Sequence, residues 1–206
     1  MNQDLKPTRA ELRALKRKLG VVRWGHTLLK RKQEALMAEF FKNLALYREA
    51  EQATARAMAT AGRAATLAEM AADRVNSWSF AMTRAGRMGV TVGRTGFMGT
   101  TLPELESVHD RRETELIPGE SAYNFQAALE AEKLVEQIIY LAAVEARTRV
   151  LLDEIERTKR RVNALERRVI PGLEEDRKFI EGRLDELERE ALFALKRIRA
   201  KIGTRQ

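Results

Sequence analysis

Residues 141–169 read LAAVEARTRVLLDEIERTKRRVNALERRV, and the spacing within this stretch decides the fold. The seam positions recur at alternating steps of three and four, at Leu141, Val144, Thr148, Leu151, Ile155, Thr158, Val162, Leu165 and Val169. Their mean spacing of 3.5 residues is that of a coiled-coil heptad, and Lys, Arg and Glu fill most positions between them. A helix with such a seam needs a second helix to cover it.

The seam predicts one long helix over residues 122–202. Beyond Pro171 it resumes at Ile180, Leu184, Leu187, Ala191, Leu195, Ile198 and Ile202. At 1.5 Å per residue this helix would be about 120 Å long. Pro171 cannot donate a backbone hydrogen bond, so we expect the helix to kink there, with Gly172 adding slack.

The partner helix is predicted over residues 8–75, with Thr8 as its cap directly after Pro7. Its own heptad seam consists of Leu12, Leu15, Leu19, Val22, His26, Leu29, Gln33, Leu36 and Phe40. Two seamed helices of similar length, separated by residues 76–121, fold back antiparallel most simply, which brings both termini to one tip. We expect residue numbers across the pair to add up to about 210 on this hairpin geometry. That register places Leu12 near Ile198, and Phe40 and Phe41 near Pro171.

Residues 76–121 differ in composition from the helices on either side. They contain six of the chain's 12 glycines together with Pro103 and Pro118, and Val90–Val92 is a plausible short strand. We predict a small, turn-rich head in which a β-hairpin can form, located at the tip away from the termini. The predicted fold class is therefore mainly α, a long antiparallel two-helix coiled coil with a small head.

Composition argues against an enzyme. The 206 residues include no Cys, and His26 and His109 are the only histidines, so we expect no metal site and no cofactor. A two-helix coil offers its carboxylates no cleft in which burial could raise a pKa for acid–base work. The longest apolar run is too short to cross a bilayer, and we expect a soluble, cytoplasmic chain.

The net charge of +8 is concentrated at the ends of the chain. Residues 1–32 contain ten Lys and Arg against two acids, and residues 187–206 are basic again. Such a tip suits nucleic acid, an acidic lipid surface or an acidic protein collar. Trp24 and Trp78 are packing anchors or contacts, and His26 on the seam is more often a register residue than a ligand. A basic coiled-coil scaffold or nucleic-acid arm is the alternative function, although aromatic residues do not alternate with the charges.

Four stretches carry a specific resemblance. They are PTRAELRALKRKL at residues 7–19, GHTLLKRKQEAL at 25–36, RRVNALE at 160–166 ahead of Ile170–Pro171, and LDELEREALFALK at 184–196. Together they resemble the D subunit of the V-type and archaeal-type ATP synthases. The resemblance covers both long helices, and the RVNALE run before Ile-Pro is its most specific part.

This resemblance implies a central rotor shaft that performs no bond chemistry and binds no nucleic acid. The tip with both termini would enter the hexamer of catalytic A and B subunits. The other end would carry the F subunit, around residues 134–151 and the helix facing them, and stand on a membrane-side socket subunit above the proteolipid ring. The chain would then be peripheral, at the cytoplasmic face of the membrane, and would couple proton or sodium transport to ATP synthesis or hydrolysis.

By the same mapping, two groups of residues are candidates for function. The hexamer-facing contacts would be Arg9, Arg13, Lys16, Lys30, Lys32, Lys196 and Lys201. The residues that set the conformation near the kink would be Arg161, Asn163, Glu166 and Pro171.

Overall fold

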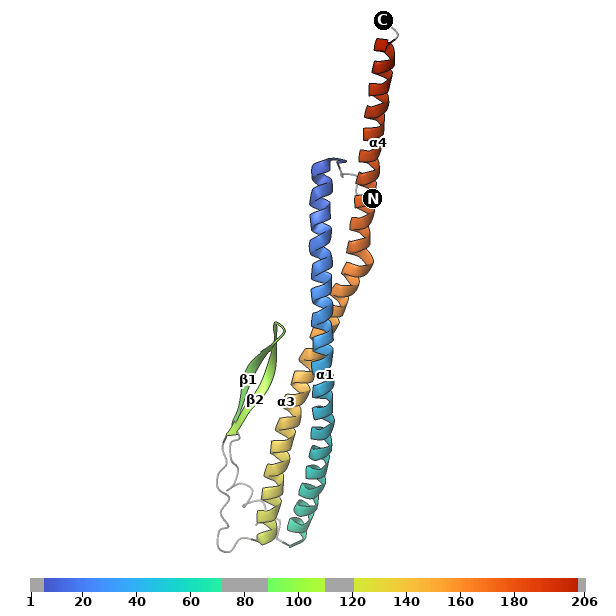
Figure 1. Ribbon diagram of the computed structural model, residues 1–206. Coiled ribbons are helices and arrows are strands. Elements are labelled where there is room, and N and C mark those ends of the chain that lie inside the picture. Colours follow the sequence, from blue (N-terminus) through green and yellow to red (C-terminus); the bar gives the residue numbers. More distant parts are fainter. Residues whose placement is uncertain (1–5, 72–88, 110–120, 204–206) are drawn as a thin grey trace. The chain divides into compact units, whose positions relative to one another are not determined.

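A computed structural model describes residues 6–71, 89–109 and 121–203 (Figure 1). Its elements are α1 (Arg9–Ala71), β1 (Gly89–Phe97), β2 (Thr100–His109), α3 (Ala122–Ala164), the π-helix η1 (Leu165–Val169) and α4 (Ile170–Gly203). The predicted class, mainly α with two long helices and a small head, is confirmed. The predicted boundaries near residue 75, the rest of the 76–121 head and Trp78 lie outside the described residues.

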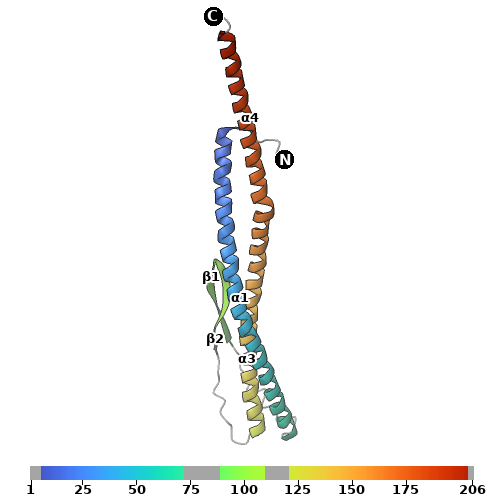
Figure 2. The same cartoon turned by 45° about the vertical axis from the view of Figure 1, so that its right-hand side comes forward.

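The chain divides into two compact units. We call residues 1–34 with 156–206 the terminal unit, and residues 35–155 the hairpin unit. Each unit contains one part of α1 alongside one part of the helical segment that begins at residue 122, and the two helices run antiparallel (Figure 2).

Helix α1 begins where the sequence predicts. Thr8 caps it, because its hydroxyl oxygen accepts a hydrogen bond from the Glu11 amide at 3.2 Å and its carbonyl accepts one from the Leu12 amide at 3.0 Å. Pro7 precedes the cap and cannot extend the helix backward.

In the terminal unit, α1 and α4 pack through a small apolar cluster. Leu15, Leu19 and Leu173 are its buried members, with Val22 and Ile170 packed against them. Three ion pairs border it, which we call the charge ladder: Arg9 with Glu188 at 2.5 Å, Lys16 with Glu181 at 2.8 Å, and Arg23 with Glu174 at 2.5 Å. Both sides of the ladder advance by seven residues per step, so the ion pairs repeat once per heptad.

The charge ladder shows that the predicted register was wrong. Paired residue numbers add up to 197 rather than about 210, so Leu12 does not lie opposite Ile198. The error is close to two heptads. An apolar seam repeats every heptad, so it fits about equally well after such a slip, and only the charged positions distinguish the alternatives.

The π-helix η1 interrupts the α-helical pattern directly before Pro171. The Ile170 amide donates to the Leu165 carbonyl, five residues back, and the helix continues on both sides. A wider turn of this kind accommodates a proline that lacks an amide hydrogen and crowds the preceding turn. The sequence predicts a kink at this proline, and the structure shows a π-helical turn directly before it.

In the hairpin unit, the strands pack against the side of the helix pair. Leu102 of β2 is fully buried in one cluster with Leu36, Leu151 and Ile155. Phe97 and Phe40 pack against this cluster. The hairpin therefore does not cap the far tip as predicted, because its Leu102 and Phe97 pack here, about 35 residues before the end of α1. The predicted place of Phe40, near Pro171, was also wrong, and Phe41 is 58% exposed.

The β-hairpin itself is regular apart from one bulge. Its strands pair antiparallel from Gly89↔His109 to Phe97↔Thr100, with the irregularity between Thr91 and Val92. Met98 and Gly99 form the two-residue turn with φ of 48° and 75°, the left-handed values that such turns require. The predicted strand at Val90–Val92 lies within β1.

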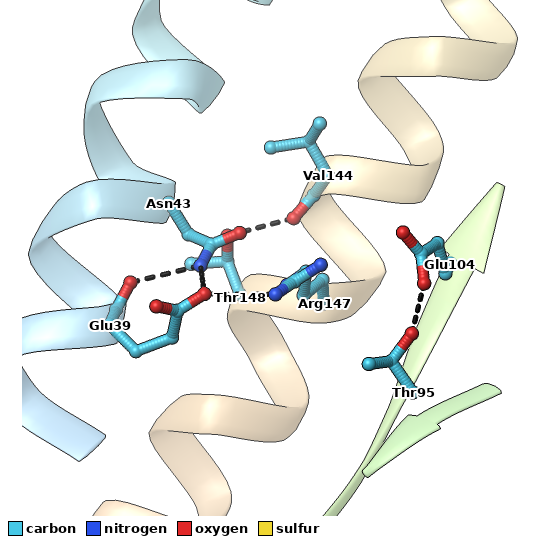
Figure 3. Close-up of polar contacts among 7 residues, drawn as sticks. All are labelled: Glu39, Asn43, Thr95, Glu104, Val144, Arg147 and Thr148. Atoms are coloured by element: carbon cyan, nitrogen blue, oxygen red, sulfur yellow. Dashed lines mark hydrogen bonds and ion pairs between the residues drawn. The ribbon is translucent and has the colours of Figure 1, made fainter. Parts of the chain in front are cut away.

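A polar cluster fixes α1 against α3 (Figure 3). Asn43 is buried, and its Nδ2 donates to the carbonyl oxygen of Glu39 at 2.9 Å and to Oε1 of the same residue at 3.1 Å. That carboxylate also accepts a hydrogen bond from Nη2 of Arg147 across the seam at 2.8 Å. Both ion-pair partners are largely buried, so a change of register would leave unpaired charge at the interface.

We expect Leu102→Ala to release the hairpin without unfolding the helices. Truncating a fully buried leucine costs about 2–5 kcal/mol, and the described hairpin has no other fully buried side chain to hold it. Hydrogen exchange should therefore accelerate in residues 89–109 while the α1 and α3 amides stay protected. Val92→Ala, at a side chain 60% exposed, is the control. Unchanged hairpin exchange in Leu102→Ala would contradict this packing.

The charge ladder should make the terminal unit sensitive to acid. Hydrogen bonds from Arg23 and Lys16 lower the pKa of Glu174 and of Glu181 from the ordinary 4.5. A lowered folded-state pKa stabilises the fold above the unfolded value, and this contribution is lost as the pH falls below 4.5 through the folded pKa. Denaturant titrations at pH 7 and pH 3.5 should show a smaller acid loss in the double variant Lys16→Met, Arg23→Met than in the wild type. Equal losses would show that the ladder does not contribute.

Candidate functional site

The candidate site is the surface of the terminal unit, where the predicted hexamer-facing cations lie. Arg13, Lys30 and Lys196 are exposed, and Lys32 is half-buried. Lys201 belongs to α4, but its side chain lies outside the described residues. The local sequence pattern correctly predicts that these cations lie on helices, because polar residues occupy the positions of a heptad outside the apolar seam.

Arg9 and Lys16 differ from the other predicted contacts, because both belong to the charge ladder. Their side chains keep exposures of 72% and 53%, so each is accessible while it pairs with a glutamate of α4. Arg23 completes the ladder, although it was not among the residues predicted to contact the hexamer. The signal that would have identified it is the seven-residue step from Arg9 through Lys16.

The residues predicted to set the conformation near Pro171 are only partly brought together. Glu166 lies within η1, and its Oε2 is 4.0 Å from Nε2 of His26 on α1. The His26 side chain is 20% exposed, in agreement with its seam position. Arg161 and Asn163 lie on exposed positions in the last turn of α3. The structure thus gives Glu166 a partner, whereas it places Arg161 and Asn163 at the surface.

The end of α4 is an exposed apolar surface that sequence reasoning missed. Arg9, the first residue of α1, pairs with Glu188, so residues 189–203 extend beyond the start of α1. Every side chain from residue 185 to residue 199 is exposed, including Leu187, Leu195 and Ile198 at 52%, 60% and 55%. We call residues 189–199 the overhang. The predicted register paired these residues with α1 and therefore concealed them.

The hairpin unit has exposed apolar residues of its own on α3. Val135, Ile138 and Tyr140 are 40%, 47% and 42% exposed and fall in the stretch predicted to meet the F subunit. An open hollow of about 380 Å³ lies near the end of this helix pair, between Arg63 and Leu67 of α1 and Tyr123 and Glu130 of α3. Glu130 is the carboxylate that lines it, and a hydrogen bond from Lys133 lowers its pKa, which is the opposite of what a general acid needs.

Among the described residues, no group of three or more His, Asp or Glu side chains is placed to hold a metal ion. Within the same part of the chain, no helix has a stretch long and apolar enough to cross a membrane.

Comparison with known proteins identifies the family. Residues 11–200 match the family described as the D subunit of ATP synthase. The chain is 38% identical to the A-type ATP synthase D subunit of Methanococcoides burtonii, over 96% of this chain and 98% of the relative. It is 40% identical to the protein of the same name in Methanoregula boonei, over 97% of each chain, and 38% identical to that of Pyrococcus furiosus, over 98% and 96%. The chain therefore belongs to the family of ATP synthase D subunits.

Proposed function

We propose that this chain is the central rotor shaft of an A-type ATP synthase. In this role it transmits torque between a hexamer of catalytic A and B subunits and the proteolipid ring in the membrane. It carries out no bond chemistry itself, and it couples proton or sodium transport to ATP synthesis or hydrolysis. The family assignment supports membership of the complex, and the overhang is the observation that favours the shaft role.

The overhang suits insertion into a surrounding protein. A single helix with exposed Leu195 and Ile198 presents an apolar stripe to water, which is costly unless another protein covers it. Within the hairpin unit the equivalent stripe is covered by α1, through residues such as Leu36 against Leu151. We therefore propose that the hexamer covers the overhang.

The basic residues of the terminal unit support an acidic partner. We propose that Arg13, Lys30, Lys32, Lys196 and Lys201 face the hexamer directly. Arg9 and Lys16 face it as well, while the ladder pairs each of them with a glutamate of α4. Complementary charge of this kind speeds association and orients the partners more than it adds affinity.

The hairpin unit would carry the remaining partners. The exposed Val135, Ile138 and Tyr140 support an F subunit on α3, together with the α1 surface beside them. The membrane-side socket subunit would receive the end of this helix pair. The segment from Arg161 to Pro171 would set the path of the shaft, since the π-turn gives this point a conformation that a regular helix lacks.

Rotation of the chain within the assembled complex tests the proposal. The sequence contains no Cys, so Glu69→Cys provides a single attachment point for an optical probe. With A and B subunits immobilised, we expect unidirectional rotation of the probe during ATP hydrolysis that stops when ATP is removed. A complex that hydrolyses ATP while the probe remains stationary would contradict the shaft role.

Charge reversal in the terminal unit should slow assembly. We expect Lys30→Glu with Lys196→Glu to lower the association rate with the A/B hexamer by about tenfold at low salt, since both cations are exposed and steer the encounter. Stopped-flow or interferometry measurements at two salt concentrations give the rate and its salt dependence. Arg56→Glu, an exposed position of the hairpin unit, should bind like the wild type. A double variant that keeps the wild-type rate would remove these residues from the interface.

A further inference from the structure

Helix α1 carries a second heptad pattern, on the side that faces away from α4. We call it the outward seam, and it consists of Ala10, Ala14, Arg17, Val21, Trp24, Leu28 and Arg31. Its members follow at steps of four and three, with the same mean spacing of 3.5 residues as the buried seam. At about 100° per residue, Trp24 lies about 180° around the helix axis from the buried Leu15.

The apolar members of the outward seam are unusually exposed. Val21 and Trp24 are each 68% exposed and Leu28 is 53% exposed, so the described part of the chain leaves all three largely uncovered. A single exposed apolar residue is ordinary on a protein surface. Three of them at heptad spacing, with a tryptophan at the centre, form instead the kind of stripe that a second helix covers.

The charges along α1 separate into two groups. The cations that face α4, namely Arg9, Lys16 and Arg23, are paired in the charge ladder. Arg17 and Arg31 lie within the outward seam, and no carboxylate of the described residues forms an ion pair with either of them. The described part of the chain therefore supplies no acidic group that matches these arginines.

We propose that the outward seam binds an amphipathic α-helix of a neighbouring synthase subunit, one that carries Asp or Glu beside its apolar stripe. The heptad spacing indicates a helix as the occupant, because side chains at this interval interlock with those of another helix. The arginines indicate its charge, since guanidinium groups at an interface favour carboxylate partners. The inference rests on the proposed function, but it specifies the face of α1 and the chemistry of the partner.

Substitutions at Trp24 test both the location and the charge of the partner. In the full-length chain, Trp24→Glu should weaken binding to the reconstituted A/B hexamer by tenfold or more, because it removes an aromatic anchor and adds repulsion. Trp24→Lys removes the same ring without that repulsion and should weaken binding less. Met70→Glu is the control, on the same helix and 81% exposed. Helical circular dichroism should be unchanged in all three, because neither side chain is buried.

A photo-reactive benzoylphenylalanine at position 24 identifies the occupant directly. In the assembled A/B complex we expect the cross-linked peptide to be a helix bearing Asp or Glu next to apolar residues. A complex that assembles normally with Trp24→Glu, or one in which position 24 cross-links to a basic or non-helical segment, would overturn this inference and leave the shaft role intact. Failure of the wild-type chain to assemble with A and B subunits would instead overturn the proposed function.

Discussion

The register between α1 and its antiparallel partner helix is the constraint on which the other features depend. Two heptad seams on their own allow several registers, because the apolar pattern repeats after every seven residues. The ion pairs are what differ from one register to another. Single exposed ion pairs contribute little to stability, but a small difference is sufficient to choose between registers with similar apolar contacts.

The charged residues of both units explain this choice. The register predicted from the seams would place Arg9 opposite Lys201 and Glu188 opposite Val22, so repulsion and an unpaired acid would replace the attractive contact between Arg9 and Glu188. A slip of one heptad would keep a ladder in the terminal unit, with Lys30 opposite Glu174. The same slip in the hairpin unit would place Glu39 opposite Glu154 and remove its contact with Arg147. The charge ladder therefore disfavours the register predicted from the seams, and the Glu39–Arg147 pair disfavours a slip of one heptad.

Sequence predicted the elements better than it predicted their contacts. The Thr8 cap, the two long helices and a strand at Val90–Val92 follow from local residue patterns, and the structure contains all of them. The overhang could not be predicted from local residue patterns, because it depends on the register between α1 and α4. The side-on position of the hairpin depends on Leu102 meeting Leu36 and Leu151, residues that are far apart in the sequence. Pro171 predicts that the helix is irregular at this point but not that the irregularity is a π-turn, since several backbone arrangements accommodate a proline within a helix.

The same register connects the fold to the proposed role. It leaves the overhang without a partner among the described residues, and it directs one group of cations toward α4 while another remains available on the outward seam. A shaft inside a larger assembly needs both properties, namely a stable helix pair and uncovered surfaces for other subunits.

The most direct test measures the register by pulsed electron paramagnetic resonance, with nitroxide labels on paired cysteines. The structure places Leu12 level with Asp185, and Ile198 is 13 residues further along α4. At 1.5 Å per residue, Ile198 should lie about 20 Å further along the helix axis. We predict a short distance for the 12/185 pair and a clearly longer one for 12/198. The reverse order would show that the helices pair as their seams alone suggest, and the overhang would not exist.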